Sequence, residues 1–236
     1  MRIEVKDIQA GYGAGADVLH GIDLVAEPNS AVGVIGANGA GKSTLLKVIC
    51  GFLKPRAGTV SIAGKSALDL SPHRLAELGI GYLMEGHSVF ASLTVEENLM
   101  LGTWSFRGDR ARVKREIDNA YSLSPILSTK RNIRAGLLSG GQQRLLELER
   151  LALIRPSLIV LDEPSLGLAP KLVQEVFDRI SALRAAGATI LIVDQSARRV
   201  CAVCDHVYVL RLGKIHVSGP AADFTNRIEE IVREFI

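Results

Sequence analysis

Short apolar runs alternate with segments of helical periodicity along this chain. Arg2–Lys6 alternates apolar and charged residues at period two, which predicts a half-exposed strand. Continuous apolar runs predict buried strands, and these lie at Ala31–Ile35, Leu158–Leu161 and Thr189–Val193. A further strand is expected at Gly79–Met84. Helical spacing over Ser43–Cys50 follows the run Ala31–Ile35, and His206–Leu210 with Lys214–Val217 predicts a closing hairpin. The alternation predicts an α/β fold, a mixed sheet flanked by helices.

The middle of the chain has a different pattern. From about Gly86 to Arg150 no β-branched run occurs, and polar-rich helical patterns dominate. Thr94-Val-Glu-Glu97 has the spacing of a capping box that opens a helix, and Asp109–Tyr121 carries dense mixed charge. We therefore expect a single domain over residues 1–236, with a helical subdomain at approximately 86–152 inserted in the α/β core.

Composition excludes several classes of protein. The 236 residues are 47% hydrophobic, which excludes wholesale disorder, and a net charge of +3 is too small to indicate a nucleic-acid binder. The longest stretch without a charged side chain is Pro28–Gly41, which has 14 residues and contains a proline and four glycines. It is well short of the roughly 18–20 apolar residues that a membrane-spanning helix needs. The first residues have no apolar signal-peptide region. We expect a chain that stays in the cytoplasm.

Three cysteines cannot form a closed set of disulfides, which fits a reducing compartment. Cys201 and Cys204 make a CxxC motif, but a metal or redox site needs a second pair or a strand–turn–helix setting. The sequence offers neither. We interpret these two cysteines as packing residues one helical turn apart.

A phosphate-binding loop follows the strand Ala31–Ile35. Its G-x-x-x-x-G-K-S pattern stands between a buried strand and a helix, the context that such a loop requires. Glycines turn successive backbone N–H groups inward, and the helix N-terminus adds partial positive charge. We expect Lys42 to bind the β- and γ-phosphates and Ser43 to supply a hydroxyl to Mg²⁺. The full loop comprises Gly36, Ala37, Asn38, Gly39, Ala40, Gly41, Lys42, Ser43 and Thr44.

Two acidic residues end the strand that begins at Leu158. Ligands bind at the carboxyl edge of a parallel sheet, so Asp162 is expected to reach the Mg²⁺ beside Ser43. Glu163, one residue farther along, is expected to orient and polarise the attacking water. The pair predicts nucleotide hydrolysis rather than binding alone.

A second glycine-containing helix start follows Leu138. Ser139, Gly140, Gly141 and Gln142 open the helical run Leu145–Ile154 without an intervening loop, which makes a second anion site at a helix N-terminus. One triphosphate does not need two such sites, whereas a dimer in which each chain closes over the other's nucleotide does. Here the sequence resembles the ATP-binding subunits of ATP-binding cassette (ABC) transporters over essentially its whole length, and this motif resembles their signature sequence.

The resemblance implies roles for further residues. Tyr12 matches the aromatic residue that stacks on adenine, and Ser165–Pro170 resembles the loop that crosses the dimer interface. Two positions depart from the general family pattern. Glu85 stands where a Gln contacts Mg²⁺ and water, and Gln195 stands where a His contacts the γ-phosphate. Gln195 can donate a hydrogen bond but cannot become cationic near neutral pH. Glu85 is expected to ligate the metal, but it adds a negative charge beside the phosphates. Both replacements favour a slower or more tightly coupled ATPase.

These departures also indicate a subfamily. Glu85-Gly86, the run Phe90–Leu99, the run Asp162–Pro170 and the Gln at 195 are similar to the LivF-type ATPase of branched-chain amino-acid importers and their amide, urea and aromatic-acid relatives. Arg144–Arg150 is less typical of that group.

The resemblance implies an ATPase that uses ATP and Mg²⁺ and works at the cytoplasmic face of the inner membrane. It implies a homodimer, or a heterodimer with a second ABC ATPase, bound to membrane permease subunits and served by a solute-binding protein, with no nucleic acid as partner. The loop Glu85–Ser92 would act as the lever, with Phe90 and Leu93 either docking a membrane subunit or packing on the insertion. The alternatives are a soluble ABC ATPase acting on DNA or ribosomes and a nucleotide-sensing subunit without turnover.

Overall fold

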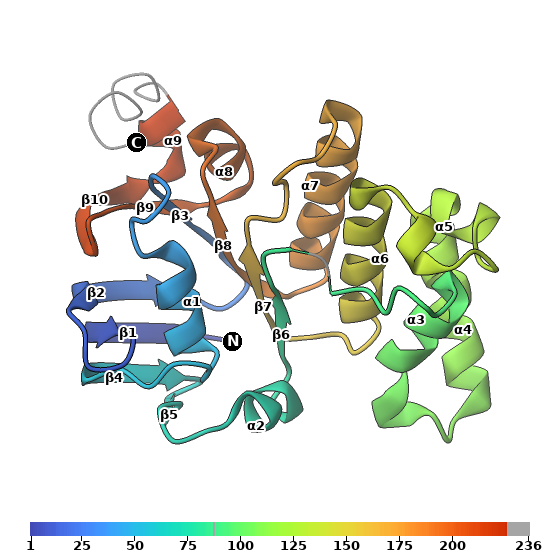
Figure 1. Ribbon diagram of the computed structural model, residues 1–236, viewed down its shortest axis with the longest axis horizontal. Coiled ribbons are helices and arrows are strands. Elements are labelled where there is room, and N and C mark those ends of the chain that lie inside the picture. The colour runs from blue at the N-terminus through green and yellow to red at the C-terminus, as the bar shows by residue number, and fades with distance from the viewer. Residues whose placement is uncertain (87, 226–236) are drawn as a thin grey trace. The chain divides into compact units, whose positions relative to one another are not determined.

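The computed structural model describes residues 1–86 and 88–225, which divide into two compact units. The first unit comprises Met1–Tyr82, Ser157–Glu163 and Arg184 onward, and the second comprises Leu83–Pro156 and Pro164–Leu183. Residue 87 of the expected loop Glu85–Ser92, and residues 226–236 of the expected domain, lie outside the described residues. Figure 1 labels the α-helices and β-strands used below.

Two sheets form in the described part of the chain. One has the strand order β2-β1-β4-β5 and antiparallel pairing, and the other has the order β10-β9-β3-β8-β7-β6. In the second sheet β3 pairs in parallel with both β8 and β9, β7 pairs in parallel with β8, and β10 pairs antiparallel with β9. The strands are β1 (Ile3–Gly11), β2 (Asp17–Ala26), β3 (Ala31–Ile35), β4 (Ala57–Ile62), β5 (Lys65–Ser66), β6 (Ile80–Leu83), β7 (Leu158–Asp162), β8 (Thr189–Asp194), β9 (His206–Arg211) and β10 (Lys214–Pro220).

Helices of the first unit flank these sheets, and helices make up most of the second unit. The 3-10 turns are η1 (Trp104–Phe106) and η2 (Ala135–Leu137). The α-helices are α1 (Lys42–Ile49), α2 (Pro72–Glu77), α3 (Val95–Gly102), α4 (Arg110–Leu123), α5 (Pro125–Thr129), α6 (Gly140–Ala152), α7 (Pro170–Ala185), α8 (Ala197–Val203) and α9 (Ala221–Thr225). The mixed sheet with flanking helices confirms the expected α/β class. Among the described residues, none of the helices combines the length and apolar character needed to cross a bilayer.

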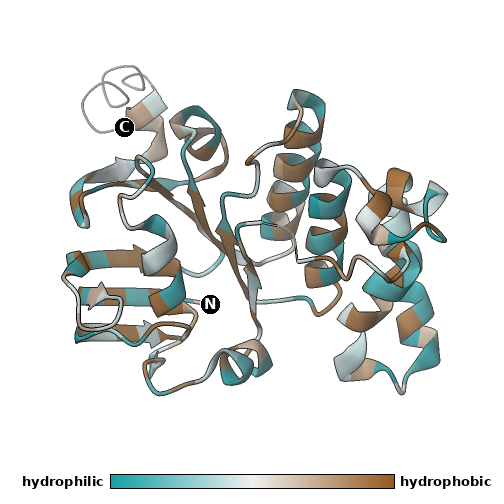
Figure 2. Ribbon diagram, viewed as in Figure 1, coloured by the Kyte–Doolittle hydropathy of each residue, from teal (hydrophilic) through white to brown (hydrophobic). Residues whose placement is uncertain are grey.

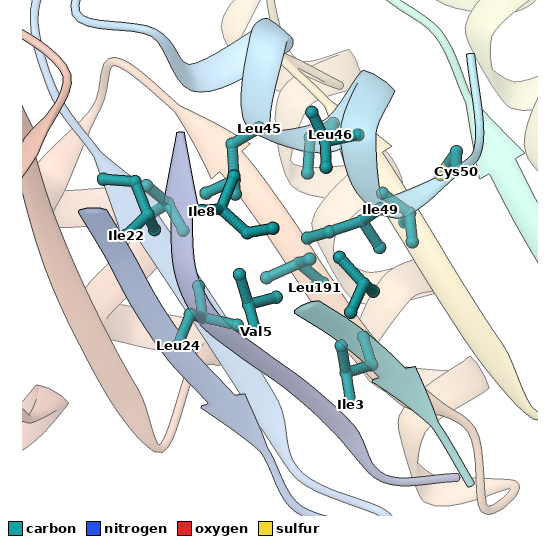
Figure 3. Packing of buried hydrophobic residues seen from close by; sticks show 14 of the residues in the cluster. Ile3, Val5, Ile8, Ile22, Leu24, Leu45, Leu46, Ile49, Cys50 and Leu191 are labelled. Atoms are coloured by element: carbon teal, nitrogen blue, oxygen red, sulfur yellow. The ribbon is translucent and has the colours of Figure 1, made fainter. Parts of the chain in front are cut away.

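Apolar side chains of α1 form the centre of the first unit's core. Leu45, Leu46 and Ile49 are buried and belong to one cluster with apolar residues of β1, β2 and β8 (Figure 3). Every residue of β3, β7 and β8 is buried, and β7 and β8 are predominantly brown in Figure 2. Burial on both faces explains why these strands are continuous apolar runs in the sequence.

The structure extends the sequence prediction mainly in the first sheet. The strand expected at Arg2–Lys6 continues to Gly11, and its pairing with β2 shifts register between Val5 and Ile8, where Asp7 has φ 45. A bulge of this kind breaks the period-two alternation, so the sequence pattern ends before the strand does. The partner strand β2 contains Gly21 at φ 75, which interrupts its pattern in the same way.

The second unit has its own core, built by α3, α4, α5 and α6. Its buried apolar residues include Val95, Leu99, Leu127 and Leu146. The capping box expected at Thr94 is present: Thr94 Oγ1 accepts from the Glu97 backbone N–H, and the Glu97 carboxylate accepts from the Thr94 N–H at 2.7 Å.

Candidate nucleotide-binding site

The phosphate loop joins β3 to α1 through two glycines in left-handed conformations. Gly39 has φ 80 and Gly41, the N-cap of α1, has φ 108, values that favour glycine strongly over other residues. A Cβ at Gly41 would also lie 2.8 Å from Leu19 Cδ2. The N–H groups in the first turn of α1 have no carbonyl partner within their own helix, so this turn can receive an anion.

Lys42 is buried and folds back over the loop that carries it. Its Nζ donates to Gly36 O at 2.9 Å and to Ala37 O at 3.1 Å, and it lies 3.2 Å from Glu163 Oε1. The ammonium group is therefore held between carbonyls at the start of the loop and the carboxylate of Glu163, the residue that follows β7.

Ser43 and Asp162 lie together, as their expected role requires. Ser43 Oγ donates to Asp162 Oδ1 at 3.1 Å, and Tyr82 Oη donates to Asp162 Oδ2 at 3.4 Å. A hydroxyl and a carboxylate are the hard oxygen ligands that Mg²⁺ takes, and Mg²⁺ bound with phosphates needs only one or two protein ligands. No cluster of three or more His, Cys, Asp or Glu suited to a metal occurs among the described residues. This donor set fits a magnesium ion that a nucleotide helps to hold.

Glu163 has a strained backbone and a buried carboxylate. Its φ is 44, in the left-handed region that residues with a Cβ seldom adopt, and its N–H donates to Val193 O at 2.8 Å. Gln195 Nε2 donates to Glu163 Oε1 at 3.1 Å and to Oε2 at 2.8 Å. The expected catalytic pair is therefore in direct contact.

Tyr12 lies beside the first turns of α1, with a half-exposed side chain. Its hydroxyl is 3.2 Å from Thr44 Oγ1 and receives a hydrogen bond from Lys47 Nζ at 3.4 Å, and that Nζ lies 5.4 Å from the centre of the Tyr12 ring. The exposed ring leaves surface on which a purine can stack.

Two neighbours of Asp162 were not found from the sequence. Tyr82 donates a hydrogen bond to the carboxylate, and the charge of that carboxylate also acts on the pKa of the Cys50 thiol. Burial, with a smaller effect from Asp162, raises the pKa of the Cys50 thiol to about 12. Both residues come from strand and helix segments with no motif of their own, so the sequence carries no signal for them.

The signature-like motif starts α6 in the second unit with a complete capping box. Ser139 Oγ accepts from the Gln142 N–H at 3.4 Å, and Gln142 Oε1 accepts from the Ser139 N–H at 3.2 Å and from Lys130 Nζ at 3.0 Å. A Cβ at Gly141 would come within 2.9 Å of Leu172 Cβ, so this glycine permits the close approach of α6 and α7.

The loop after β6 is tied to α6 by buried charges. Arg144 Nη1 donates to Met84 O at 2.9 Å and to Glu147 Oε2 at 3.0 Å, and Glu147 Oε1 accepts from the Ser88 N–H. Glu85, between these anchored residues, has an exposed side chain. These contacts fix the loop that carries Glu85 to the helix that carries the signature-like motif.

Phe90 and Leu93 differ in exposure. The Phe90 side chain is exposed, and the guanidinium of Arg150 lies 5.3 Å from the centre of its ring, whereas Leu93 is half-buried. In the Ser165–Pro170 segment, Leu166 is exposed and Gly167 has φ 72.

The first unit thus brings together the phosphate loop, Tyr12, Asp162, Glu163 and Gln195, whereas Glu85 and the residues Ser139–Gln142 belong to the second unit. Comparison with known proteins shows which family the chain resembles. The family model described as "ABC transporter" matches residues 19–166.

Two curated proteins are similar over most of their length. The high-affinity branched-chain amino acid transport ATP-binding protein BraG of Pseudomonas aeruginosa is 38% identical over 212 residues, covering 89% of this chain and 90% of that protein. The probable branched-chain amino acid transport ATP-binding protein LivF of Archaeoglobus fulgidus is 38% identical over 215 residues, covering 91% and 90%. A solved nucleotide-free ATP-binding cassette from an ABC transporter superposes with a TM-score of 0.86 at 29% identity, covering 99% of this chain and 98% of that one.

Proposed function

Because the chain belongs to the ABC transporter family of ATP-binding subunits, we propose that it hydrolyses ATP to drive an importer of branched-chain amino acids or a related small amide or aromatic-acid substrate. The observation that carries this proposal is the contact set of Lys42, Ser43, Asp162 and Glu163, which joins a phosphate-binding loop to a buried carboxylate. The similarity to BraG and LivF supports the choice of transported substrate.

ATP binding rests on the loop Gly36–Thr44. The N–H groups of the loop and of the first turn of α1 donate to the β- and γ-phosphate oxygens, and Lys42 adds its positive charge. Tyr12 stacks on the adenine. Ser43 and Asp162 hold Mg²⁺, which when bound neutralises negative charge on the phosphate oxygens.

Hydrolysis depends on Glu163. Its carboxylate accepts a hydrogen bond from a water molecule and takes its proton as the water oxygen attacks the γ-phosphorus, and the bond to the leaving ADP oxygen breaks. Gln195 donates to the Glu163 carboxylate and so fixes its orientation. Gln195 can also donate to a γ-phosphate oxygen but cannot carry a positive charge there.

We further propose that two ATPase chains, identical or related, close over two nucleotides. The N-terminus of α6 at Ser139–Gln142 then binds the γ-phosphate held by the other chain. The loop 85–92 transmits the motion to membrane permease subunits at the cytoplasmic face of the membrane, with Phe90 at the contact. A solute-binding protein delivers the substrate to those subunits.

The proposal is tested by Glu163→Gln, which keeps the shape of the side chain but removes the proton acceptor. We expect steady-state ATP hydrolysis to fall by at least a hundredfold, while the affinity for a fluorescent ATP analogue stays within about threefold of the parent. Equal hydrolysis rates would overturn the role of Glu163. Loss of nucleotide binding in Lys42→Ala serves as the control for the phosphate loop.

Glu85 is tested separately as a metal ligand. If its carboxylate contributes to the Mg²⁺ site, Glu85→Gln shifts the Mg²⁺ concentration at half-maximal hydrolysis while the Lys42 and Ser43 contacts remain. An unchanged Mg²⁺ titration argues against this role for Glu85.

A further inference from the structure

The corner between α3 and α4 concentrates positive charge in the second unit (green in Figure 1). Residues 104–115 contain five basic side chains and one acidic side chain, a net charge of +4, whereas the whole chain carries +3. The rest of the chain is therefore close to neutral. The basic side chains of this corner are those of Arg107, Arg110, Arg112, Lys114 and Arg115.

One basic residue of the corner has an acidic partner just outside it, because Arg115 Nη2 lies 3.6 Å from Glu116 Oε1. Within 104–115 the one acidic residue caps a helix. Asp109 is the N-cap of α4, and its Oδ1 accepts from the Arg112 N–H at 2.9 Å. Its negative charge is thus directed to the positive end of the helix. Arg107, Arg110 and Lys114 are exposed.

Aromatic rings share the corner with these cations. Trp104 is the single tryptophan of the chain, and 65% of it is exposed. The guanidinium carbon of Arg107 lies 4.2 Å from the Trp104 ring centre, and that of Arg112 lies 4.1 Å from the Phe106 ring centre. Met100 and Leu101, in the last turn of α3, add exposed apolar surface.

Backbone hydrogen bonds give the corner a defined conformation. The Phe106 N–H donates to Thr103 O at 3.0 Å, and the Asp109 N–H donates to Phe106 O at 2.9 Å. Arg107 Nη1 also donates to Trp104 O at 2.8 Å, so the cation that covers the ring is bonded to the same residue. Trp104 is therefore exposed by the fold of the corner and not by fraying of a chain end.

We propose that this corner, residues 100–115, binds the headgroup region of an anionic lipid bilayer. An exposed tryptophan beside several arginines has the chemistry of an interfacial contact, in which the indole enters the headgroup layer and the cations bind lipid phosphates. The contact would hold the second unit against the membrane independently of any protein subunit.

The single tryptophan allows a direct test with the full chain. Its fluorescence is recorded while protein-free vesicles are added, either of phosphatidylcholine alone or with phosphatidylglycerol as the anionic lipid. We expect a shift of Trp104 emission to shorter wavelength and co-sedimentation with the anionic vesicles, both reduced at high salt because the attraction is screened.

Matched variants separate the effect of this surface on vesicle binding from the effect of the chain's net charge. Each basic residue near an anionic surface contributes about fivefold to partitioning, so Arg107→Gln/Arg110→Gln is expected to bind the vesicles more than tenfold more weakly. Lys54→Gln/Lys65→Gln removes the same charge from exposed positions of the first unit and is expected to bind like the parent. ATP hydrolysis is measured on every variant and is expected to be unchanged, which keeps this test separate from that of the catalytic site.

Three results would overturn the proposal. One is the absence of any fluorescence shift with protein-free anionic vesicles. Another is equal binding of the two double variants. The third is binding that occurs only when the vesicles carry a membrane protein, which would assign the corner to a protein partner.

Discussion

The amide of Gln195 donates to both carboxylate oxygens of Glu163, at 3.1 and 2.8 Å, within a largely buried site. A hydrogen bond to a charged group contributes about 1.5–3 kcal/mol. Because this contact orients the carboxylate, we expect Gln195→Ala to lower the kcat of ATP hydrolysis by about 10- to 100-fold with little change in KM. Steady-state rates over a range of ATP concentrations check this, and an unchanged kcat would contradict it.

Gln195→His provides the complementary variant. An imidazole retains a donor but becomes cationic below a pKa of about 6.5. We expect the hydrolysis rate of the variant, divided by that of the parent, to change between about pH 6 and pH 7. Parallel pH–rate profiles would show that residue 195 does not act on the reacting groups.

The left-handed backbone of Glu163 predicts a stability difference between two variants that both remove its side chain. A residue with a Cβ at φ 44 costs about 1–2 kcal/mol relative to glycine. Glu163→Gly is therefore expected to be more stable than Glu163→Ala by about 1 kcal/mol, although both abolish hydrolysis. Urea denaturation of the two proteins measures the difference, and equal midpoints would contradict the strain.

The close packing at Gly141 predicts a loss of stability on substitution and a partial recovery by a second substitution at Leu172. A Cβ there would lie 2.9 Å from Leu172 Cβ and 3.0 Å from Leu172 Cγ, so Gly141→Ala forces α6 and α7 apart despite the better helix propensity of alanine. We expect a loss of about 1–3 kcal/mol in the free energy of unfolding. Leu172→Ala removes Cγ and the atoms beyond it but keeps Cβ, so the double variant is expected to recover only part of this loss. Additive losses would contradict the proposed overlap.

The Arg144–Glu147 pair is almost fully buried, with side chains 3% and 0% exposed. Removing one partner of such a pair typically costs about 3–5 kcal/mol, because the remaining charge stays buried. We expect Glu147→Leu to destabilise the protein by that amount and to loosen the backbone at Ser88. Arg144→Met/Glu147→Leu is expected to be more stable than Glu147→Leu alone. Thermal denaturation and hydrogen exchange at residues 84–90 measure the two effects.

Burial raises the pKa of Cys50 to about 12 and raises the pKa of Cys204 as well. A thiol whose pKa is higher in the folded protein than in the unfolded chain loses its proton more readily in the unfolded chain. At alkaline pH this difference favours the unfolded state. Stability is therefore expected to be unaffected by these thiols below about pH 8.5 and to fall as the pH rises from there towards 12. Urea denaturation at pH 8, 9.5 and 10.5 measures how steeply the free energy of unfolding falls with pH. A shallower fall in Cys50→Ala would assign part of the effect to Cys50.

Local motifs carried most of the information that the sequence offered about the site. The loop 36–44, the acids at 162 and 163 and the helix start at Ser139 are each defined by a few neighbouring residues, so their elements could be predicted from the chain alone. Tyr82 and Cys50 approach Asp162 only through tertiary folding, and neither has a local pattern. The hydrogen bond from Arg144 to the Met84 carbonyl joins residues 60 positions apart, and no local pattern predicts it.

The fold was predicted best where strands are buried on both faces. β3, β7 and β8 are continuous apolar runs and were found within one residue of their bounds. The antiparallel sheet was found only in part, because the register shifts at Val5/Ile8 and the positive φ of Gly21 disturb the alternation on which a strand prediction depends.

The position of β3 also governs when the phosphate loop can form during synthesis. β3 pairs only with β8 and β9 in the described residues, and the loop's Ala40 O accepts from the N–H of Gly213, at the turn of the last hairpin. These supports come from the final quarter of the chain. A ribosome has therefore made the loop sequence long before it makes the strands that hold the loop in shape. Competence to bind nucleotide is a late event in biosynthesis, and a chain truncated before the β9–β10 hairpin carries the motif without the site.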